Sequence, residues 1–509
     1  MSYLVLLKLA SPEAIVVVTA LAVLAAGLTS GRRTVEAAAS YAKPSANAGD
    51  TPAATATASV ICSIVATLGL AVAIGAVFML PQNATLFGGM LVITPLTSLF
   101  KIICLALALF TVFLARTNRE SRNPGEYLAM LLLATIGLML LVGSEELLVI
   151  FIGLELTGLS LYVMVAFDKT DVRSAEAGLK YFLFGSTASA FTLFGISLTY
   201  GMSGTTSLPA IGQKLSIVPV QALLAVGIVM TLIGFAFKIA AAPFHLWAPD
   251  AYQGAPVSSA AFIASGSKVA SFVVLGKIVL VGFAPVHGSA NWHAMVTGWS
   301  PVLAALAAVS ILVGNLVALA QTNVRRLLAY SAVAHAGYTL LGLVAGGRDG
   351  FSATLFYTTA YAITLVGAFG VVALVRHKTG GDDFANFSGL WTRSPLLAGC
   401  MAIFMLSLAG IPPLAGFFGK FYLFSAALRG GGDHGLLWLV ALALFGSLIS
   451  LYYYLIVLKV IFVDETAIQT SAVKVDLLSR MSLTLLALFV LVLGIMPETL
   501  AARIIASVP

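Results

Sequence analysis

The sequence predicts an all-α polytopic membrane protein with about fourteen transmembrane helices, and three observations indicate this fold class. Of the 509 residues, 60% are hydrophobic and only 9% are charged. A soluble globular protein carries roughly 25% charged residues, because its surface faces water. The mean hydropathy is +1.04, and apolar stretches of membrane-spanning length recur along the chain. Most of the protein surface is therefore expected to face lipid.

The predicted spans follow from length, because a helix needs about 20 apolar residues to cross the hydrocarbon core. The candidate spans are 13–28, 58–80, 90–115, 127–143, 146–167, 178–202, 218–243, 256–283, 298–320, 327–346, 351–376, 395–428, 435–463 and 476–496. The first stretch could be read as a signal peptide. Its basic pair Arg32–Arg33 follows the apolar run instead of preceding it, so we expect an uncleaved first helix.

The basic residues are distributed unequally between the loops. Loops after odd-numbered spans hold Arg32, Arg33, Lys43, Arg116, Arg119, Arg122, Lys169, Arg173, Arg325, Arg326, Arg376, Lys378, Arg393, Lys474 and Arg480, whereas loops after even-numbered spans hold only Lys214, Arg348 and Arg429. The positive-inside rule places the first set in the cytoplasm and both termini on the non-cytoplasmic side. The net charge of +7 is thus explained by topology. We expect no nucleic-acid partner, because the basic residues form no continuous face or run.

Two features concern the loops and the cofactors. Residues 34–57 are rich in Ala, Thr, Pro and Ser without apolar periodicity, which predicts a flexible cytoplasmic linker. The three cysteines, Cys62, Cys104 and Cys400, stand singly in apolar segments without a CxxC spacing. This pattern favours no disulfide, iron–sulfur cluster or zinc site. A Gly-rich phosphate-binding loop is also missing from the sequence, so we expect no metal and no redox cofactor in this chain.

Proline interrupts two apolar stretches that are too long for one straight helix. Residues 216–252 contain Pro243 and Pro249, and residues 395–428 contain Pro412 and Pro413. Free backbone groups at membrane depth are tolerated only inside protein or beside water. Paired interruptions in two halves of a chain are typical of transporters built from repeats, with the ion path at the breaks. Two ordinary kinked helices would give the same pattern.

Several ionisable residues fall inside the predicted spans, where each costs about 2.5–3.5 kcal/mol. Those nearest the expected midplane are Glu155, Lys238 and Lys268, and Lys420 follows the second break. Lys101, Lys180 and Lys277 lie closer to span ends, where snorkelling to the headgroups is an alternative explanation. His335 lies mid-span beside Tyr330, Ser331 and Tyr338, and either a packing role or a relay role fits it.

A row of buried lysines can act as a proton switch. Burial lowers the pKa of a lysine, and a carboxylate within about 4–6 Å raises it again. When Glu155 approaches Lys238, this lysine would hold its proton. When Glu155 withdraws, the proton could pass through water and polar groups to Lys268 and then to Lys420.

The motifs around these residues resemble one known family, the antiporter-like membrane subunits of respiratory complex I, and specifically subunit N (mitochondrial subunit 2). The resemblance covers residues from about 90 to 500. Its stretches are GLELTGLSLYV, LKYFLFGSTASA, GFAFKIAAAPFHLWAPDAYQGAPVSSAAFIASGSKVASF, VRRLLAYSAVAHAGY and GIPPLAGFFGKFYLF. The AYQGAP segment and the lysine of SGSKVA favour subunit N over its larger paralogues.

The resemblance implies a fold of two inverted five-helix repeats with two discontinuous helices. The implied division is 1–126 for three N-terminal helices, 127–283 and 298–463 for the repeats, and 464–509 for the last helix. It implies that Glu155 and Lys238 form the input pair, that Lys268 is the central relay, that Lys420 is the exit-side lysine, and that Lys180 lies near Glu155. The lysine precedes one break and follows the other, so the repeat does not follow from the motifs alone.

The resemblance also implies a bacterial inner-membrane location, other membrane-arm subunits of complex I as partners, and protons as the transported species. NADH, flavin, iron–sulfur clusters and quinone are expected in other subunits. Two further functions remain open: a subunit of a multi-component cation/proton antiporter, and a subunit of a related hydrogenase or ferredoxin-driven complex. A purely structural membrane spacer is a third alternative.

Overall fold

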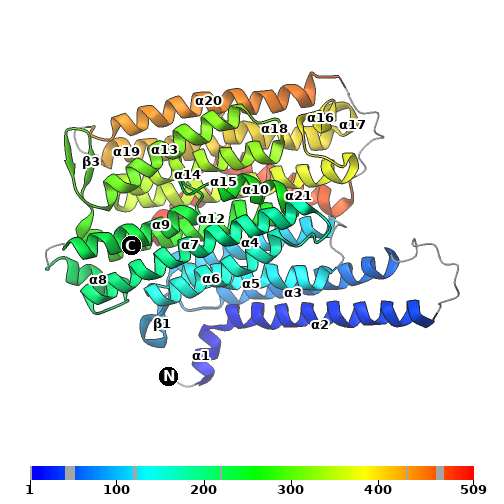
Figure 1. Ribbon diagram of the computed structural model, residues 1–509, viewed down its shortest axis with the longest axis horizontal. Helices are drawn as coiled ribbons and strands as arrows, with labels where there is room; N and C mark the ends of the chain where they lie inside the picture. The colour runs from blue at the N-terminus through cyan, green and yellow to red at the C-terminus, as the bar shows by residue number, and fades with distance from the viewer. Residues whose placement is uncertain are drawn as a thin grey trace.

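The structure is a computed structural model that describes residues 3–40, 52–117, 123–217, 221–430, 434–465 and 475–508. Within these ranges, twelve helices are long and apolar enough to cross a membrane, and two apolar helices are shorter. The helices lie roughly parallel to one another, along the horizontal direction of Figure 1. The predicted all-α membrane fold is confirmed, and every predicted span contains one of these helices.

The N-terminal part contains three long helices and one hairpin. Its elements are α1 (Tyr3–Leu9), α2 (Ser11–Ser40), α3 (Pro52–Phe78), β1 (Ala84–Leu86), η1 (Phe87–Gly89), β2 (Leu91–Ile93) and α4 (Pro95–Thr117). The span predicted from residue 90 begins only at Pro95, because 91–93 pair with β1 as an antiparallel strand. The predicted linker 34–57 is helical at both ends. Its centre, residues 41–51, lies outside the described residues, so its flexibility stays a prediction.

Two successive sets of five spans follow. The first comprises α5 (Pro124–Gly143), α6 (Leu147–Val165), α7 (Val172–Ser203), the pair α9 (Ala222–Lys238) and α10 (Trp247–Gly254), and the continuous run α11 (Val257–Phe262), η2 (Ile263–Ser267), α12 (Lys268–Lys277) and η3 (Ile278–Gly282). The second comprises α13 (Trp299–Leu319), α14 (Val324–Ala345), α15 (Gly347–Thr379), the pair α18 (Pro395–Ala409) and α19 (Ala415–Gly430), and α20 (Leu437–Phe462). The discontinuous helix is the fourth member of each set, which confirms both predicted breaks.

The remaining elements connect or close the bundle. They are α8 (Leu208–Leu215), η4 (Ala284–Val286), β3 (Ser289–Asn291), β4 (Ala294–Val296), α16 (Phe384–Phe387), α17 (Leu390–Arg393), α21 (Leu477–Ile495) and α22 (Glu498–Ser507). Strand β3 pairs with β4 in a second antiparallel hairpin. Figure 1 shows β1, α8 and β3 at one end of the bundle, with α16 and α17 at the other.

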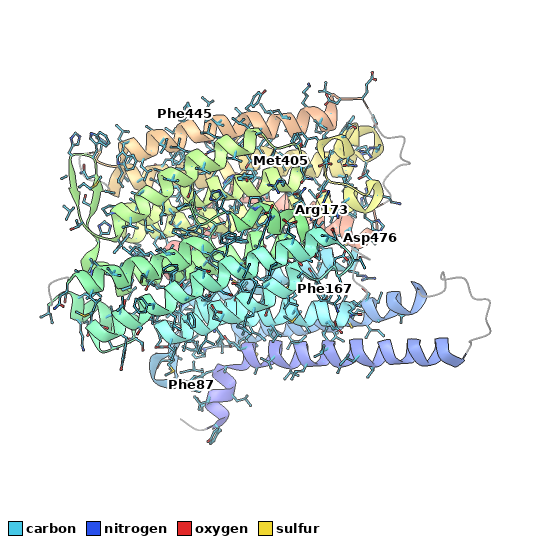
Figure 2. All side chains as sticks on the ribbon, in the orientation of Figure 1. Phe87, Phe167, Arg173, Met405, Phe445 and Asp476 are labelled. Carbon is cyan, nitrogen blue, oxygen red and sulfur yellow. The ribbon has the colours of Figure 1, made fainter. Side chains whose placement is uncertain are left out.

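Burial divides the helices into central and lipid-facing ones. In the apolar segments of α14 and α15, 94% of the residues are buried within the protein, against 33% in the apolar segment of α7. Phe445 on α20 is 57% exposed, and Figure 2 shows its side chain on the outer side of that helix. Large apolar residues on an outer face are stable only where lipid or another protein covers them. The central helices α14 and α15 are therefore the best place for buried polar groups.

A buried ion-pair cluster holds the start of α14 against the loop after α15. The Arg325 guanidinium, 1% exposed, pairs with Asp382 and donates a 2.8 Å hydrogen bond to the Ala255 carbonyl. Arg376 pairs with the other oxygen of Asp382 at 3.2 Å. Burial alone would raise the pKa of Asp382, but the charges of Arg325 and Arg376 hold this pKa below its ordinary value. Arg325 is therefore more than a topology signal, because it ties the two sets of spans together.

Candidate functional site

Glu155 lies on α6, and its carboxylate faces α7. The Ser189 hydroxyl on α7 donates a hydrogen bond to one carboxylate oxygen of Glu155. Lys238 is the last residue of α9 and is 5% exposed. In the described part of the chain its ammonium forms no hydrogen bond, although it lies within Coulombic range of Glu155. The two predicted partners thus interact electrostatically without a direct hydrogen bond.

The break between α9 and α10 begins directly after Lys238. Ala240 has φ of 58°, a left-handed conformation that a residue with a Cβ rarely adopts. The Ala242 amide donates to the Ser310 hydroxyl of α13 at 2.8 Å, and the Trp247 indole donates to the Phe237 carbonyl at 3.0 Å. Side chains therefore satisfy backbone groups that the interrupted helix leaves free, as backbone at membrane depth requires.

Lys268 follows a π-helical turn in the middle of its span. The turn η2 covers Ile263–Ser267, and such single turns occur frequently at functional sites. Lys268 is 2% exposed and donates a 2.6 Å hydrogen bond to the Ala332 carbonyl of α14. Its ammonium also lies 5.5 Å from the centre of the Tyr361 ring, within cation–π range. The central lysine therefore contacts both α14 and α15.

His335 on α14 lies at the centre of a group of tyrosines. Its Nδ1 is 2.5 Å from the Tyr357 hydroxyl of α15, and its Nε2 is 3.0 Å from the Tyr454 hydroxyl of α20. The Tyr361 ring, which faces the Lys268 ammonium, has its centre 4.8 Å from the centre of the His335 imidazole. Both ring nitrogens thus have hydroxyl partners that can exchange a proton.

Lys420 lies on the other side of His335, on α19. Its ammonium donates to the Ala409 carbonyl at 3.0 Å and to the Ser447 hydroxyl at 2.8 Å. It is 4% exposed and lies 5.2 Å from the centre of the Tyr338 ring. The same Tyr338 ring packs edge-on against His335, with the ring centres 5.6 Å apart. His335 and its tyrosines therefore fill the space between Lys268 and Lys420.

Lys180 does not join this group. It forms ion pairs with Glu176 at 2.7 Å and with Asp250 at 2.8 Å, rather than with Glu155, and its side chain is 40% exposed. The residue of α7 that contacts Glu155 is Ser189, nine positions further along the helix and about 14 Å away at 1.5 Å per residue. The implied placement of Lys180 near Glu155 is thus corrected.

The structure also corrects the snorkelling explanation for Lys101 and Lys277. Each is 3% exposed. Lys101 pairs with Glu13 of α2 at 2.6 Å, and Lys277 pairs with Glu145 at 3.6 Å. Both are buried ion pairs instead of headgroup ligands.

Sequence reasoning missed Ser189, Tyr357, Tyr361 and Tyr454 as members of the site. Tyr357 and Tyr361 are four residues apart on α15 and share one face of the helix. This spacing could have indicated two tyrosines beside one buried group, but tyrosines at the same spacing also occur in ordinary core packing. Among the described residues no group of three or more His, Cys, Asp or Glu side chains could hold a metal ion.

Comparison with known proteins places the chain in a family. Residues 144–450 match the family model described as NADH:quinone oxidoreductase/Mrp antiporter, TM. NADH-quinone oxidoreductase subunit N 2 of Acidobacterium capsulatum is 47% identical over 444 residues, which cover 85% of this chain and 89% of that protein. A chain of respiratory complex I from Thermus thermophilus with bound aureothin is 30% identical, with a TM-score of 0.76 and coverage of 96% and 98% of the two chains.

A chain of the Mrp complex from Dietzia sp. DQ12-45-1b is 20% identical with a TM-score of 0.77, over 97% of both chains. At this identity the likeness shows a shared fold alone. The curated relative and the complex I structure go further, because their identity extends over most of both chains. The chain therefore belongs to the subunit N family of NADH-quinone oxidoreductase, the antiporter-like membrane subunits of respiratory complex I.

Proposed function

We propose that this chain translocates protons as a membrane subunit of NADH-quinone oxidoreductase, and that Glu155, Lys238, Lys268, His335 and Lys420 carry the protons. Its similarity to subunit N of other bacteria supports the parent complex. NADH, flavin, iron–sulfur clusters and quinone would be held by other subunits. The chain would contribute the membrane path, and would respond to conformational or electrostatic signals from the redox subunits.

The first step would depend on the distance between Glu155 and Lys238. In the structure the Glu155 carboxylate accepts a hydrogen bond from Ser189. Lys238 is attracted by the charge of Glu155 but forms no direct hydrogen bond with it. Approach of Glu155 favours the charged lysine, and withdrawal favours release of its proton. The strained turn at Ala240, directly after Lys238, is a suitable place for the small movement that this step needs.

The observation that carries the proposal is the link from Lys268 to Lys420 through His335. Lys268 contacts Tyr361, Tyr361 contacts His335, and His335 contacts Tyr338 beneath Lys420. Lysine in a membrane interior is costly, and two such lysines facing one imidazole are hard to explain as packing. A neutral imidazole can accept a proton on one nitrogen and release one from the other, which suits it to the centre of a relay.

The test replaces Lys238 or Glu155 by alanine in the complete complex. We expect NADH-driven proton pumping and coupled quinone reduction to fall while the amount of assembled complex stays normal. Lys169→Ala is the matched control, because this lysine is exposed in the loop between α6 and α7. Pumping at the control level in both variants would overturn the relay. Normal pumping with reduced complex abundance would favour the structural-spacer alternative.

The second candidate is a cation/proton antiporter subunit, because the matching family model also covers Mrp antiporters. It predicts sodium-dependent changes of ΔpH in vesicles that lack NADH. We also propose an inner-membrane orientation with both termini on the non-cytoplasmic side, from the distribution of lysine and arginine. Protease or thiol labelling of the loop after α15 from the cytoplasmic side tests this orientation.

A further inference from the structure

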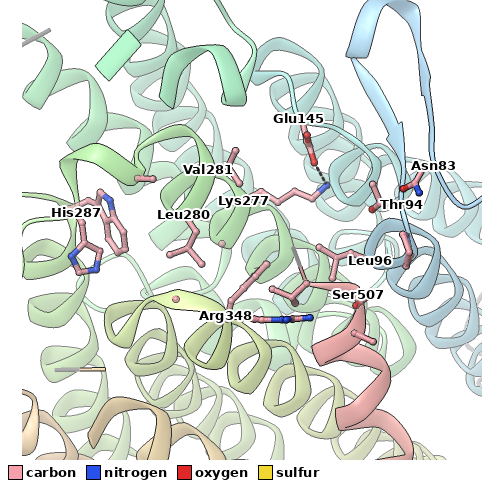
Figure 3. Close-up of a pocket in the computed structure, with 18 residues that line it drawn as sticks. Asn83, Thr94, Leu96, Glu145, Lys277, Leu280, Val281, His287, Arg348 and Ser507 are labelled. Atoms are coloured by element: carbon pink, nitrogen blue, oxygen red, sulfur yellow. Dashed lines mark ion pairs between the residues drawn. The ribbon is translucent and has the colours of Figure 1, made fainter. Parts of the chain in front are cut away.

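A large cavity opens at the end of the bundle that holds β1, α8 and β3, away from the His335 group. Its volume is about 600 Å³, and its lining includes Asn83, Glu145, Lys277, His287, Arg348 and Ser507. One water molecule needs only about 10–15 Å³ of such space. Figure 3 shows Lys277 and Glu145 joined across one side of the cavity, with Arg348 and Ser507 on another. The lining comes from loops that follow even-numbered spans and from the helix ends beside them, on the side proposed to be non-cytoplasmic.

Lys277 is the buried charged group of this lining. Its ammonium donates hydrogen bonds to the carbonyl of Val142 at 2.9 Å and to that of Ser144 at 3.4 Å. These carbonyls lie at the C-terminal end of α5, where the helix dipole favours a positive charge. Glu145 approaches at 3.6 Å, and its side chain is 26% exposed. Both residues line the cavity, and Lys277 is the more deeply buried of the two.

A second ion pair stands behind the first. Lys101 also reaches the end of α5, since its ammonium lies 3.3 Å from the position that a Cβ on Gly143 would take. It pairs with Glu13 of α2 at 2.6 Å. The cluster therefore contains two lysines and two glutamates and is neutral when all four are charged. Loss of one proton from Lys277 would leave a net negative charge that draws in another proton.

The helix that carries Lys277 also carries Lys268 of the proposed relay. Both belong to α12, with Lys268 as its first residue and Lys277 as its last. Nine residues at 1.5 Å each separate them by about 14 Å along the axis. Nine residues at 3.6 per turn also rotate the helix by about 180°, so Lys268 leaves it toward α14 and Lys277 leaves it toward the end of α5. No residue of the relay itself lines this cavity.

We propose that Lys277 and Glu145 form a proton-release site that delivers protons of the relay into this cavity on the non-cytoplasmic side. The proposal rests on the proposed function. In the step, the Lys277 ammonium gives one proton to the Glu145 carboxylate, and the resulting carboxylic acid gives it to water in the cavity. The neutral Lys277 amine then accepts the next proton that arrives from inside the protein. No other co-reactant is needed.

The first test measures proton pumping and quinone reduction in the complete complex reconstituted in vesicles. Lys277→Gln keeps a donor for the Val142 carbonyl but cannot carry a proton. We expect this variant and Glu145→Gln to slow proton release through this chain by about 100-fold or more, the usual effect of losing an acid–base group. Arg348→Gln is the matched control, because Arg348 lines the same cavity but is exposed and bonded to the Ile505 carbonyl. It should pump as the unaltered complex does.

The Lys268→Ala variant separates failure of this inference from failure of the proposed function. If Lys268→Ala stops pumping while Lys277→Gln and Glu145→Gln pump normally, the release site is wrong and the relay stands. If all three pump normally, the relay itself is wrong and the release site falls with it. Loss in all three, with a normal Arg348→Gln control, supports both.

The second test asks whether the cavity is open to the non-cytoplasmic side, and it does not depend on pumping. Leu280→Cys places a thiol in the lining, and Leu275→Cys places one in the buried part of α12. Both are made in a background that lacks the buried cysteines Cys62, Cys104 and Cys400. We expect a membrane-impermeant thiol reagent to label Leu280→Cys from the non-cytoplasmic side only, and not to label Leu275→Cys. Labelling from the cytoplasmic side, or none at Leu280→Cys, overturns the proposal.

Discussion

The hydroxyl of Tyr357 offers the sharpest test of the link through His335. Tyr357→Phe removes one oxygen atom and keeps the ring, which packs at 5.9 Å from the imidazole. His335 Nδ1 then loses the hydroxyl that lies 2.5 Å away. Both residues are 2% exposed, so bulk water cannot take the place of the lost partner. The variant therefore isolates one hydrogen bond of the proposed relay.

The size of the effect follows from the burial of this nitrogen. A buried polar atom that loses its partner costs about 1–3 kcal/mol. If this cost falls on the proton transfer through His335, the step slows about 5- to 150-fold. Tyr454→Phe removes the partner of the other ring nitrogen, at 3.0 Å, and should give a loss of the same order. Because both act on one imidazole, we expect the double variant to lose less than the sum.

The assay follows NADH-driven acidification and quinone reduction in the same vesicles. In each variant, the rate of quinone reduction measured with an uncoupler present should remain near normal, while proton pumping measured without the uncoupler falls. Tyr452→Phe is the control, since Tyr452 lies on α20 beside Tyr454 but is 63% exposed. Tyr357→Phe and Tyr454→Phe variants that pump as well as Tyr452→Phe would refute the reasoning.

Three further predictions concern Glu155 and the ion pairs of Asp382. Glu155→Asp keeps the negative charge and retracts it by one methylene, so it should retain more proton pumping than Glu155→Gln. An equal loss of pumping in both variants would show that the position of the side chain matters more than its charge. Arg325→Met leaves the buried Asp382 with Arg376 and the Asn323 amide only. Breaking a buried ion pair on one side costs about 3–5 kcal/mol, which thermal unfolding of the complex would measure. Because the pKa of Asp382 is lowered in the folded protein, its contribution is present above the unfolded value of about 3.9 and is lost as the pH falls through the lowered pKa. The stability gap between the unaltered chain and Asp382→Asn should thus be constant around neutral pH and close only in acid; a gap that closes between neutral and alkaline pH would contradict this.

The spans and both breaks could be predicted because lipid imposes a simple rule on the sequence. An apolar run of about 20 residues has few alternatives to a helix in a bilayer, and Pro243 and Pro412 interrupt their runs visibly. The hairpin over 84–93 was missed because its strand 91–93 is as apolar as the helix that follows. Composition alone cannot separate a short apolar strand from the first turn of a helix.

The charged residues of the site could be named from the sequence, but their partners could not. Glu155 and Lys268 are conspicuous at bilayer depth because a charge there is costly. Tyr357 and Tyr454 are not conspicuous, because tyrosine suits both the core and the lipid interface. The partners of Lys101 and Lys277 depend on how α2, α4, α5 and α12 pack together, and no local pattern encodes that packing.

The helix α15 spans 33 residues, or about 50 Å, which exceeds the roughly 30 Å thickness of the hydrocarbon core. Arg348 near its first residue reaches the cavity, Tyr357 and Tyr361 hold His335 and Lys268 at its middle, and Arg376 near its last turn binds Asp382. One continuous helix therefore contacts the Asp382 loop, the His335 group and the cavity, and we expect a shift of α15 along its axis to change all three places together.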